Sequence, residues 1–183
     1  MIKGWVQKDF AAFKGKAVKL VRCYSMADSG DGGSTSQGFH SACDDKGPTI
    51  TIVKTKEGFV FGGAADKSWG SGGHYVASDS AFLFCLNCAG AAMGAAPSQI
   101  KQTGMTNYQG TLVHHKSLGP IFGQAPGLRI DTGGASAESS QGKLGYSYSC
   151  PAGKYKSEAC NNYLAGSGTF VVDDYEVFVV VAV

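Results

Sequence analysis

The sequence predicts a mainly β (α+β) fold, a two-sheet antiparallel β-sandwich with a few short peripheral helices. Short runs of β-branched and aromatic residues alternate with turn-forming segments, and 27 of the 183 residues are glycine. Hydrophobic residues make up 43% and charged residues 16% of the chain, which excludes a disordered polypeptide. A chain of this length can bury roughly 70% of its unfolded surface. We therefore expect a single domain over residues 1–183 that needs no disulfide or metal for stability.

The first half of the chain contains the clearest predicted elements. Apolar residues at mixed helical spacing predict a helix over residues 5–14 that packs on the domain, with a membrane-surface helix as the alternative. The segment 81–86 is apolar on both faces, which is typical of an internal strand. The other expected elements are strands at 17–24, 49–53 and 59–61, and a helix at 34–43.

The second half of the chain predicts shorter strands. They are expected at 111–114, 127–131, 145–149, 169–172 and 175–183, and Asp173-Asp174 separates the last two. The small-residue segment 88–104 predicts a loop or a weak helix. The apolar tail Val177–Val183 indicates an internal strand, and an exposed edge covered by a subunit or ligand is the alternative.

Charge and hydropathy narrow the classes of partner. The net charge is +2, and the basic residues are dispersed and include only two arginines, which argues against nucleic-acid binding. No apolar run approaches the ~20 residues that span a bilayer, so we expect no membrane insertion. No leader-like apolar segment is visible, which favours a cytoplasmic or otherwise soluble protein. Secretion stays open, because a leader could have been removed.

Six cysteines leave two redox states open. An even count permits disulfides, but the length of the chain and the missing leader favour reduced, mostly buried thiols. Cys85 and Cys88 form the one C-x-x-C motif, and a structural pair is the favoured interpretation. A redox switch and a metal site are the alternatives. A zinc site would need two further ligands, and no second closely spaced pair is present.

Common catalytic signatures are missing from the sequence. It contains no G-x-S-x-G elbow, phosphate-binding loop or H-E-x-x-H motif. The four histidines, His40, His74, His114 and His115, could join a catalytic set only through folding. Adjacent His114 and His115 would point to opposite faces of a strand, with one buried and one in solvent. We expect a protein that is not an enzyme, with no catalytic residue, no metal and no certain cofactor.

One glycine-rich segment carries the main candidate binding residues. Trp69, His74 and Tyr75 fall within residues 69–75, where four of the seven positions are Gly or Ser. Such a loop could fold over an apolar ligand or present aromatic anchors to a protein. It could equally be a surface loop whose Trp69 side chain packs into the core of the sandwich.

Several short motifs, taken in order, resemble the TLDc family from about residue 17 to residue 178. They are Phe39-His-Ser-Ala-Cys43-Asp-Asp-Lys-Gly-Pro-Thr49, Gly62-Gly63 with Trp69, Ala81-Phe-Leu-Phe84, Gly119-Pro-Ile-Phe122-Gly123, Leu164-Ala-Gly-Ser167 to Phe170, and Glu176-Val-Phe178. The resemblance implies a two-sheet sandwich with peripheral helices. It also implies a eukaryotic module linked to oxidative-stress resistance, some members of which bind the vacuolar proton pump. The family brings no agreed catalytic site.

Three functional hypotheses follow. The first is a non-enzymatic binding or regulatory domain that engages a protein partner or self-associates as a dimer. Its candidate contact residues are Trp69, His74, Tyr75, Phe122 and Phe178. The second is a carrier of an apolar small molecule, such as a lipid or a carotenoid pigment, at a subunit interface. The third is a thiol-based antioxidant that acts through Cys85 and Cys88.

Overall fold

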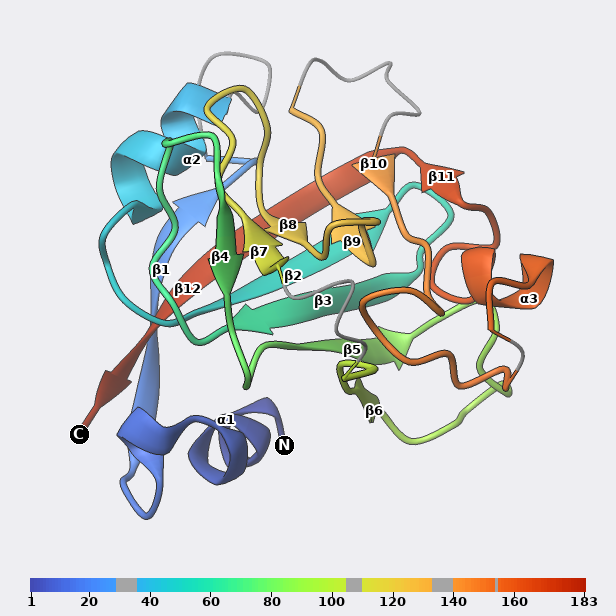
Figure 1. The fold of residues 1–183 in the computed structure, drawn as a ribbon, viewed down its shortest axis with the longest axis horizontal. Helices are drawn as coiled ribbons and strands as arrows, with labels where there is room; N and C mark the ends of the chain where they lie inside the picture. The colour runs from blue at the N-terminus through green and yellow to red at the C-terminus, as the bar shows by residue number, and fades with distance from the viewer. Residues whose placement is uncertain (29–35, 105–109, 133–139, 154) are drawn as a thin grey trace.

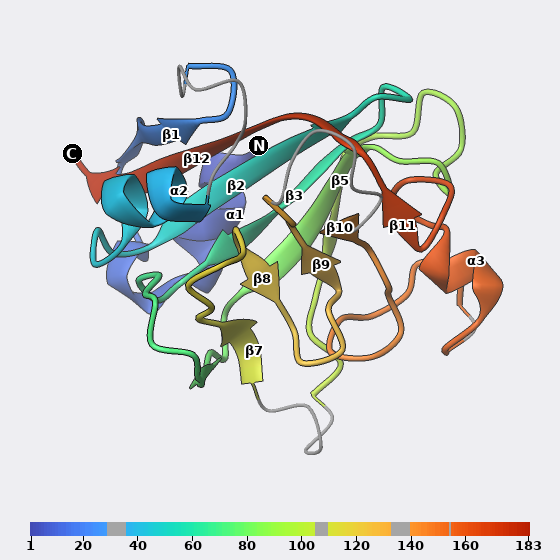
Figure 2. The ribbon, with the colours of Figure 1, turned by 90° about the horizontal axis from the view of Figure 1, so that it is seen from above.

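Two antiparallel β-sheets of six strands each form the body of the protein (Figures 1 and 2). The computed structural model describes residues 1–28, 36–104, 110–132, 140–153 and 155–183. Short helices lie at the periphery of the sheets, and a large apolar core lies between them. This architecture confirms the predicted β-sandwich. No helix in the described part of the chain has the length and apolar character needed to cross a membrane.

The first sheet contains the longest strands and extends across the whole molecule (Figure 1). Its spatial order is β1 (Val18–Ser25), β12 (Val172–Ala182), β2 (Thr49–Thr55), β3 (Val60–Ala65), β5 (Phe82–Asn87) and β6 (Ser98–Ile100). The C-terminal strand therefore lies between β1 and β2. This position confirms the expectation that the apolar tail is an internal strand.

The second sheet is built from strands of two to four residues. Its spatial order is β11 (Thr169–Phe170), β10 (Ser140–Gln141), β9 (Leu128–Arg129), β8 (Ile121–Phe122), β7 (Gly110–Val113) and β4 (Tyr75–Ala77). Helix α2 (Ser36–Cys43) lies at the β1 side of the sandwich, and the short helix α3 (Glu158–Asn161) lies at the opposite end (Figure 1).

Strand β5 shows why some strands of the first sheet are apolar on both faces. Leu83 and Cys85 point into the core between the sheets, whereas Phe82 and Phe84 point into a second core on the outer face. Alternating residues of a strand point to opposite faces, so a sheet covered on both sides needs apolar residues at every position. The continuous apolar run at 81–86 was therefore a correct signal for an internal strand.

The outer core is closed by the N-terminal segment. Helix α1 (Ile2–Asp9) and a 3₁₀ turn (Ala11–Phe13) together occupy the predicted helical region, with a break at Phe10. Val6 and Phe10 are buried there, and the Phe10 ring lies 5.8 Å from the Phe82 ring. The apolar face of α1 therefore packs on the sheet, as expected for a docked helix.

The glycine pair Gly62-Gly63 allows the two sheets to approach each other. A Cβ atom placed on Gly63 would lie 2.5 Å from the Phe122 ring of the second sheet. A Cβ atom on Gly62 would lie 2.0 Å from the Thr51 carbonyl oxygen of the neighbouring strand. The Phe122 ring therefore occupies space that any side chain at residue 63 would need.

Some predicted strand boundaries in the second half are wrong. Asp173 and Asp174 do not end a strand. They lie at a β-bulge within β12, and the Asp173 carboxylate forms an ion pair with Lys54 Nζ at 2.7 Å. Residues 145–149 form no strand, because Gly145 has a positive φ and Tyr148 makes only an isolated bridge to Gln102. Strands β4, β6, β8 and β10 were not predicted, and β6 lies within residues 88–104, where a loop or a weak helix was expected. These strands are too short to show a periodic pattern.

The expectation of reduced thiols is also wrong. The fold brings all six cysteines into three disulfides, Cys23–Cys43, Cys85–Cys88 and Cys150–Cys160. The Cα–Cα distances lie between 5.5 and 5.7 Å, within the usual range for a disulfide. The length of the chain therefore misled the prediction, since length does not report which cysteines the fold places together.

Candidate functional site

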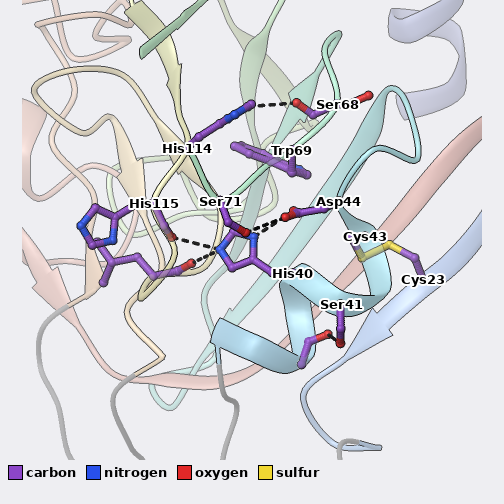
Figure 3. A network of polar contacts seen from close by, with 12 residues as sticks. Cys23, His40, Ser41, Cys43, Asp44, Ser68, Trp69, Ser71, His114 and His115 are labelled. Carbon is purple, nitrogen blue, oxygen red and sulfur yellow. Dashed lines mark hydrogen bonds and ion pairs between the residues drawn. A yellow bond between two sulfur atoms is a disulfide. The ribbon is translucent and has the colours of Figure 1, made fainter. Parts of the chain in front are cut away.

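The candidate site lies where α2 meets two loops of the second sheet (Figure 3). One loop, residues 66–74, connects β3 to β4. The other, residues 114–120, connects β7 to β8. We call the polar contacts that join them the His40 network, which consists of His40, Asp44, Ser71 and the main-chain oxygens of His115 and Leu118.

His40 is the centre of this network because both of its ring nitrogens have partners. Its Nδ1 lies 2.8 Å from the carboxylate of Asp44, which lies four residues later, directly after the end of α2. Its Nε2 lies 3.0 Å from the His115 carbonyl oxygen and 3.1 Å from that of Leu118. The side chain is only 9% exposed. His40 therefore connects α2 to residues 75 and more positions away in the sequence.

Asp44 extends the network to the loop that precedes β4. Its second carboxylate oxygen accepts a hydrogen bond of 2.8 Å from the Ser71 hydroxyl. The main chain makes a parallel bridge between Asp44 and Trp69, and the Asp45 amide donates to the Trp69 carbonyl oxygen. Both main-chain and side-chain bonds therefore hold this loop against the end of α2.

Trp69 anchors the same loop in the core. Its indole Nε1 donates a hydrogen bond of 2.8 Å to the Thr49 hydroxyl, and its side chain is 1% exposed. The ring makes an edge contact with Phe122, with centroids 5.3 Å apart, and a further edge contact with Phe39. A buried Trp that satisfies its N–H in this way fixes the position of the loop.

Two further histidines lie next to the anchored tryptophan. The His114 Nε2 lies 3.0 Å from the Ser68 carbonyl oxygen, and the His114 ring lies 4.8 Å from the His74 ring. Burial lowers the pKa of His114, although its bond to Ser68 opposes this effect. A Cβ atom at Gly70 would lie 2.9 Å from the His114 ring, so the loop needs glycine there.

The surface above these groups presents an exposed aromatic residue and a shallow pocket. Tyr75 is 57% exposed on β4, which is the edge strand of the second sheet. Next to α2 is an open pocket of about 480 Å³, lined by Gln37, His40, Ser41, Asp44, Ser71 and Lys116. We call the surface formed by His74, Tyr75, Ser71 and Lys116 the β4 face.

The geometry of the network differs from that of a catalytic serine–histidine–aspartate set. In such a set the serine hydroxyl donates to one ring nitrogen of the histidine, while aspartate binds the other. Here the Ser71 hydroxyl donates to Asp44 instead. Carbonyl oxygens only accept hydrogen bonds, so the His40 Nε2 carries a hydrogen and cannot take one from serine. The network holds segments of chain together.

The described residues also offer no group of three or more His, Cys, Asp or Glu side chains placed to hold a metal ion. Two sequence segments carry clustered carboxylates, residues 28–31 and 173–176. Asp28 and Asp173 form ion pairs with Arg22 and Lys54. Residues 29–31 lie outside the described part of the chain.

The predicted site residues separate into three groups. His74 and Tyr75 are exposed on the β4 face, while Trp69 and Phe122 are buried beneath it and contact each other. Phe178 lies on the outer face of the first sheet, against the core beneath α1. Cys85 and Cys88 form a disulfide in the inter-sheet core and are 3% and 4% exposed.

Sequence reasoning missed His40, Asp44 and Ser71 as a unit. A usable signal existed for the first two, since His40 and Asp44 are four residues apart at the end of a predicted helix. Ser71 had no signal, because only the return of the loop to α2 brings its hydroxyl to Asp44. The expected difference in exposure between the paired histidines is present, since His114 is partly buried and His115 is exposed. Their expected position in a strand is wrong, because β7 ends at Val113.

The fold and the site define a β-sandwich domain whose surface loops are fixed by a nearly buried histidine–aspartate pair. The family model of the TLDc domain matches residues 7–181, nearly the whole chain. The protein therefore belongs to the TLDc family, as the sequence motifs indicated. No curated protein matches the chain.

Proposed function

We propose that this protein is a non-enzymatic binding domain that engages a protein partner through the β4 face, in a role connected with oxidative-stress protection. The observation that carries the proposal is Tyr75, which is 57% exposed directly beyond a loop held by Trp69 and the His40 network. The membership of the TLDc family supports the connection with oxidative stress.

The chemistry of the β4 face suits a protein partner. Exposed tyrosines are enriched among the residues that dominate protein interfaces. A free strand edge can also pair with an extended segment of another chain, and β4 lies at the end of its sheet. A loop that is already rigid loses little conformational entropy on binding, which favours affinity.

The hydrogen bonds of His40 support a non-enzymatic role. Its Nε2 is occupied by two carbonyl oxygens, and Ser71 is directed to Asp44. General acid–base catalysis needs a group within reach of a substrate proton, and here both ring nitrogens are bound within the protein. The most conspicuous polar cluster of the site is thus suited to holding structure.

The two alternative functions have weaker support. The carrier hypothesis rests on the aromatic loop at residues 69–75, the small-residue segment 88–104 and the valine-rich tail. Trp69 of that loop packs against Phe122, however, and the tail lies inside the first sheet. The antioxidant hypothesis needs a thiolate, because the thiolate is the species that peroxide oxidises. Cys85 and Cys88 are joined as a buried disulfide.

A native mass spectrum of the protein from its natural source tests the class of partner. We expect the 19.0 kDa chain in a complex with another polypeptide or with a second copy, separated by denaturation. A mass excess of small-molecule size, together with absorption beyond the aromatic band, would contradict the proposal and support the carrier. Peroxide consumption that is lost in Cys85→Ser would support the antioxidant.

A further inference from the structure

Cys23 occupies an irregular position on the edge of the first sheet. In the pairing of β1 with β12, Arg22 is opposite Phe178 and Tyr24 is opposite Val177. Cys23 is therefore the extra residue of a β-bulge. Bulges occur at sheet edges and next to functional sites, where they redirect a side chain out of the regular alternation. Here the redirected side chain bonds to Cys43 of α2.

The two cysteines of this disulfide differ in their exposure to solvent. Cys23 is half-buried and lines a surface pocket of about 390 Å³ together with Arg22, Ser25, Asp28 and Gly38. Cys43 is fully buried. The volume of the pocket falls within the range that small-molecule sites occupy. A small molecule can therefore approach this bond from the Cys23 side.

The same disulfide holds the helix that organises the His40 network. Cys43 is the last residue of α2, His40 precedes it by three residues, and Asp44 follows it directly. Figure 3 shows the bond at the end of this helix, on the side away from the two loops. The covalent link thus fixes to β1 the end of α2 from which Asp44 contacts Ser71.

We propose that Cys23–Cys43 is a thiol–disulfide exchange site for a small thiol of the glutathione or cysteine type. The thiolate attacks the Cys23 sulfur, the Cys23–Cys43 bond breaks, and Cys43 leaves as a thiolate that takes a proton from solvent. A second thiolate then attacks the sulfur of the small thiol bound to Cys23, and Cys23 leaves as a thiolate that takes a proton from solvent. Two thiols are oxidised to one disulfide, and the protein gains two thiols.

Access to solvent distinguishes Cys23 from the buried cysteines of the inter-sheet core. Arg22 lines the same pocket, where its guanidinium is paired with the carboxylates of Asp28 and Glu176. Cys85 and Cys88 lack such access, because both are almost completely buried. Cys150 is half-buried like Cys23 and bonds to Cys160 at α3, so this third disulfide serves as a matched control.

Exchange at this site would regulate the β4 face, and this consequence rests on the proposed function. Without the bond, the end of α2 loses its covalent link to β1, so Asp44 holds Ser71 and the Trp69 main chain less firmly. Oxidation rigidifies the face and reduction loosens it. The thiol balance of the surroundings would then set the affinity for the partner.

The order of reduction in the folded protein tests the exchange site. The oxidised protein is incubated with graded glutathione, blocked with N-ethylmaleimide and mapped by peptide mass spectrometry. We expect the glutathione adduct on Cys23, and labelling of Cys43, at a thiol concentration at least tenfold below that which opens Cys150–Cys160. An adduct on Cys43, or the opening of either other disulfide at the same or a lower concentration, would overturn the proposal.

Hydrogen exchange tests the coupling to the site without any partner. In the double variant C23S/C43S we expect amides of residues 37–45 and 69–71 to exchange at least tenfold faster, while C150S/C160S leaves them unchanged. Unaltered exchange at α2 in C23S/C43S would overturn the regulatory link. Neither measurement involves the partner, so both can succeed where the proposed function fails.

Discussion

His40 shows how one side chain can organise a surface. The imidazole ring joins the Asp44 carboxylate on one side and the carbonyl oxygens of His115 and Leu118 on the other. The end of α2 and the loop 114–120, which are distant in sequence, therefore meet at one residue that is only 9% exposed, and Asp44 adds the loop 66–74 through Ser71.

Removing this ring tests its structural role. In His40→Ala the Asp44 carboxylate loses a charge-assisted partner and the carbonyl oxygens of His115 and Leu118 lose a donor, so we expect a loss of about 2–3 kcal/mol in the free energy of unfolding. Urea denaturation measures this loss. The matched control is Ser41→Ala on the same helix, whose hydroxyl donates to the Gly38 carbonyl oxygen at the surface. Its expected effect is within about 0.5 kcal/mol. Equal effects of the two changes would refute the role of His40.

His114 makes the stability of the protein depend on pH. Burial lowers its pKa in the folded state, so the unfolded chain binds the proton first as the pH falls. Stability is therefore complete above the ordinary histidine pKa of about 6.5 and declines as the pH falls from there toward the folded pKa. The neighbours that face this ring are His74, Asp44 and His40, and each changes the size of the effect.

We expect His114→Gln to reduce the loss of unfolding free energy between pH 7.5 and pH 5.5. The control is His115→Gln, since the His115 ring is exposed and its carbonyl oxygen stays in place. Urea titrations at the two pH values measure the difference. An unchanged pH dependence in His114→Gln would show that other groups cause it.

At the scale of elements, the glycine pair of β3 decides how closely the sheets pack. Gly63→Ala would place a methyl group about where the Phe122 ring lies, and we expect a loss of about 1–3 kcal/mol, as for overpacked cores. Thermal unfolding measures it. Gly4→Ala is the matched control, since nothing lies within 4 Å of its Cβ position on α1. Alanine there should stabilise the helix by up to about 1 kcal/mol. A neutral Gly63→Ala would contradict the close approach of the sheets.

The elements that could be predicted from the sequence are those whose own residues show a hydrophobic pattern. Strand β2 alternates between the two cores, with Ile50 in the outer one and Val53 in the inner one, and it was predicted close to its observed bounds. Strand β8 has only two residues, and its place is set by pairing with β7 and β9. No local pattern could have revealed that pairing.

The site was predictable to the extent that its residues lie close together in the sequence. His74 and Tyr75 could be named as candidates because they belong to one glycine-rich segment. The His40 network was missed because residues 40, 71, 115 and 118 meet only after the sheets have formed. Main-chain carbonyl oxygens also carry two of its contacts, and these have no signature in side-chain identity.

At the scale of the whole molecule, the three disulfides predict that this domain folds in an oxidising environment. Stable disulfides form in such compartments and are rare where thiols are kept reduced. We expect non-reducing peptide mapping of the protein from its natural source to give Cys23–Cys43, Cys85–Cys88 and Cys150–Cys160 linkages. Free thiols at all six positions would contradict this expectation.

The central claim is that the β4 face is where a protein partner binds, and photo-crosslinking tests it most directly. A photoreactive amino acid is placed at Tyr75, and in a separate variant at Tyr155, a matched exposed tyrosine beside α3. Both variants are irradiated in an extract of the natural source. We expect the photoreactive amino acid at position 75 to crosslink to one defined polypeptide, or to a second copy of the chain. The same group at position 155 should not crosslink to it. No adduct at Tyr75, or the same adducts at both positions, would contradict the claim.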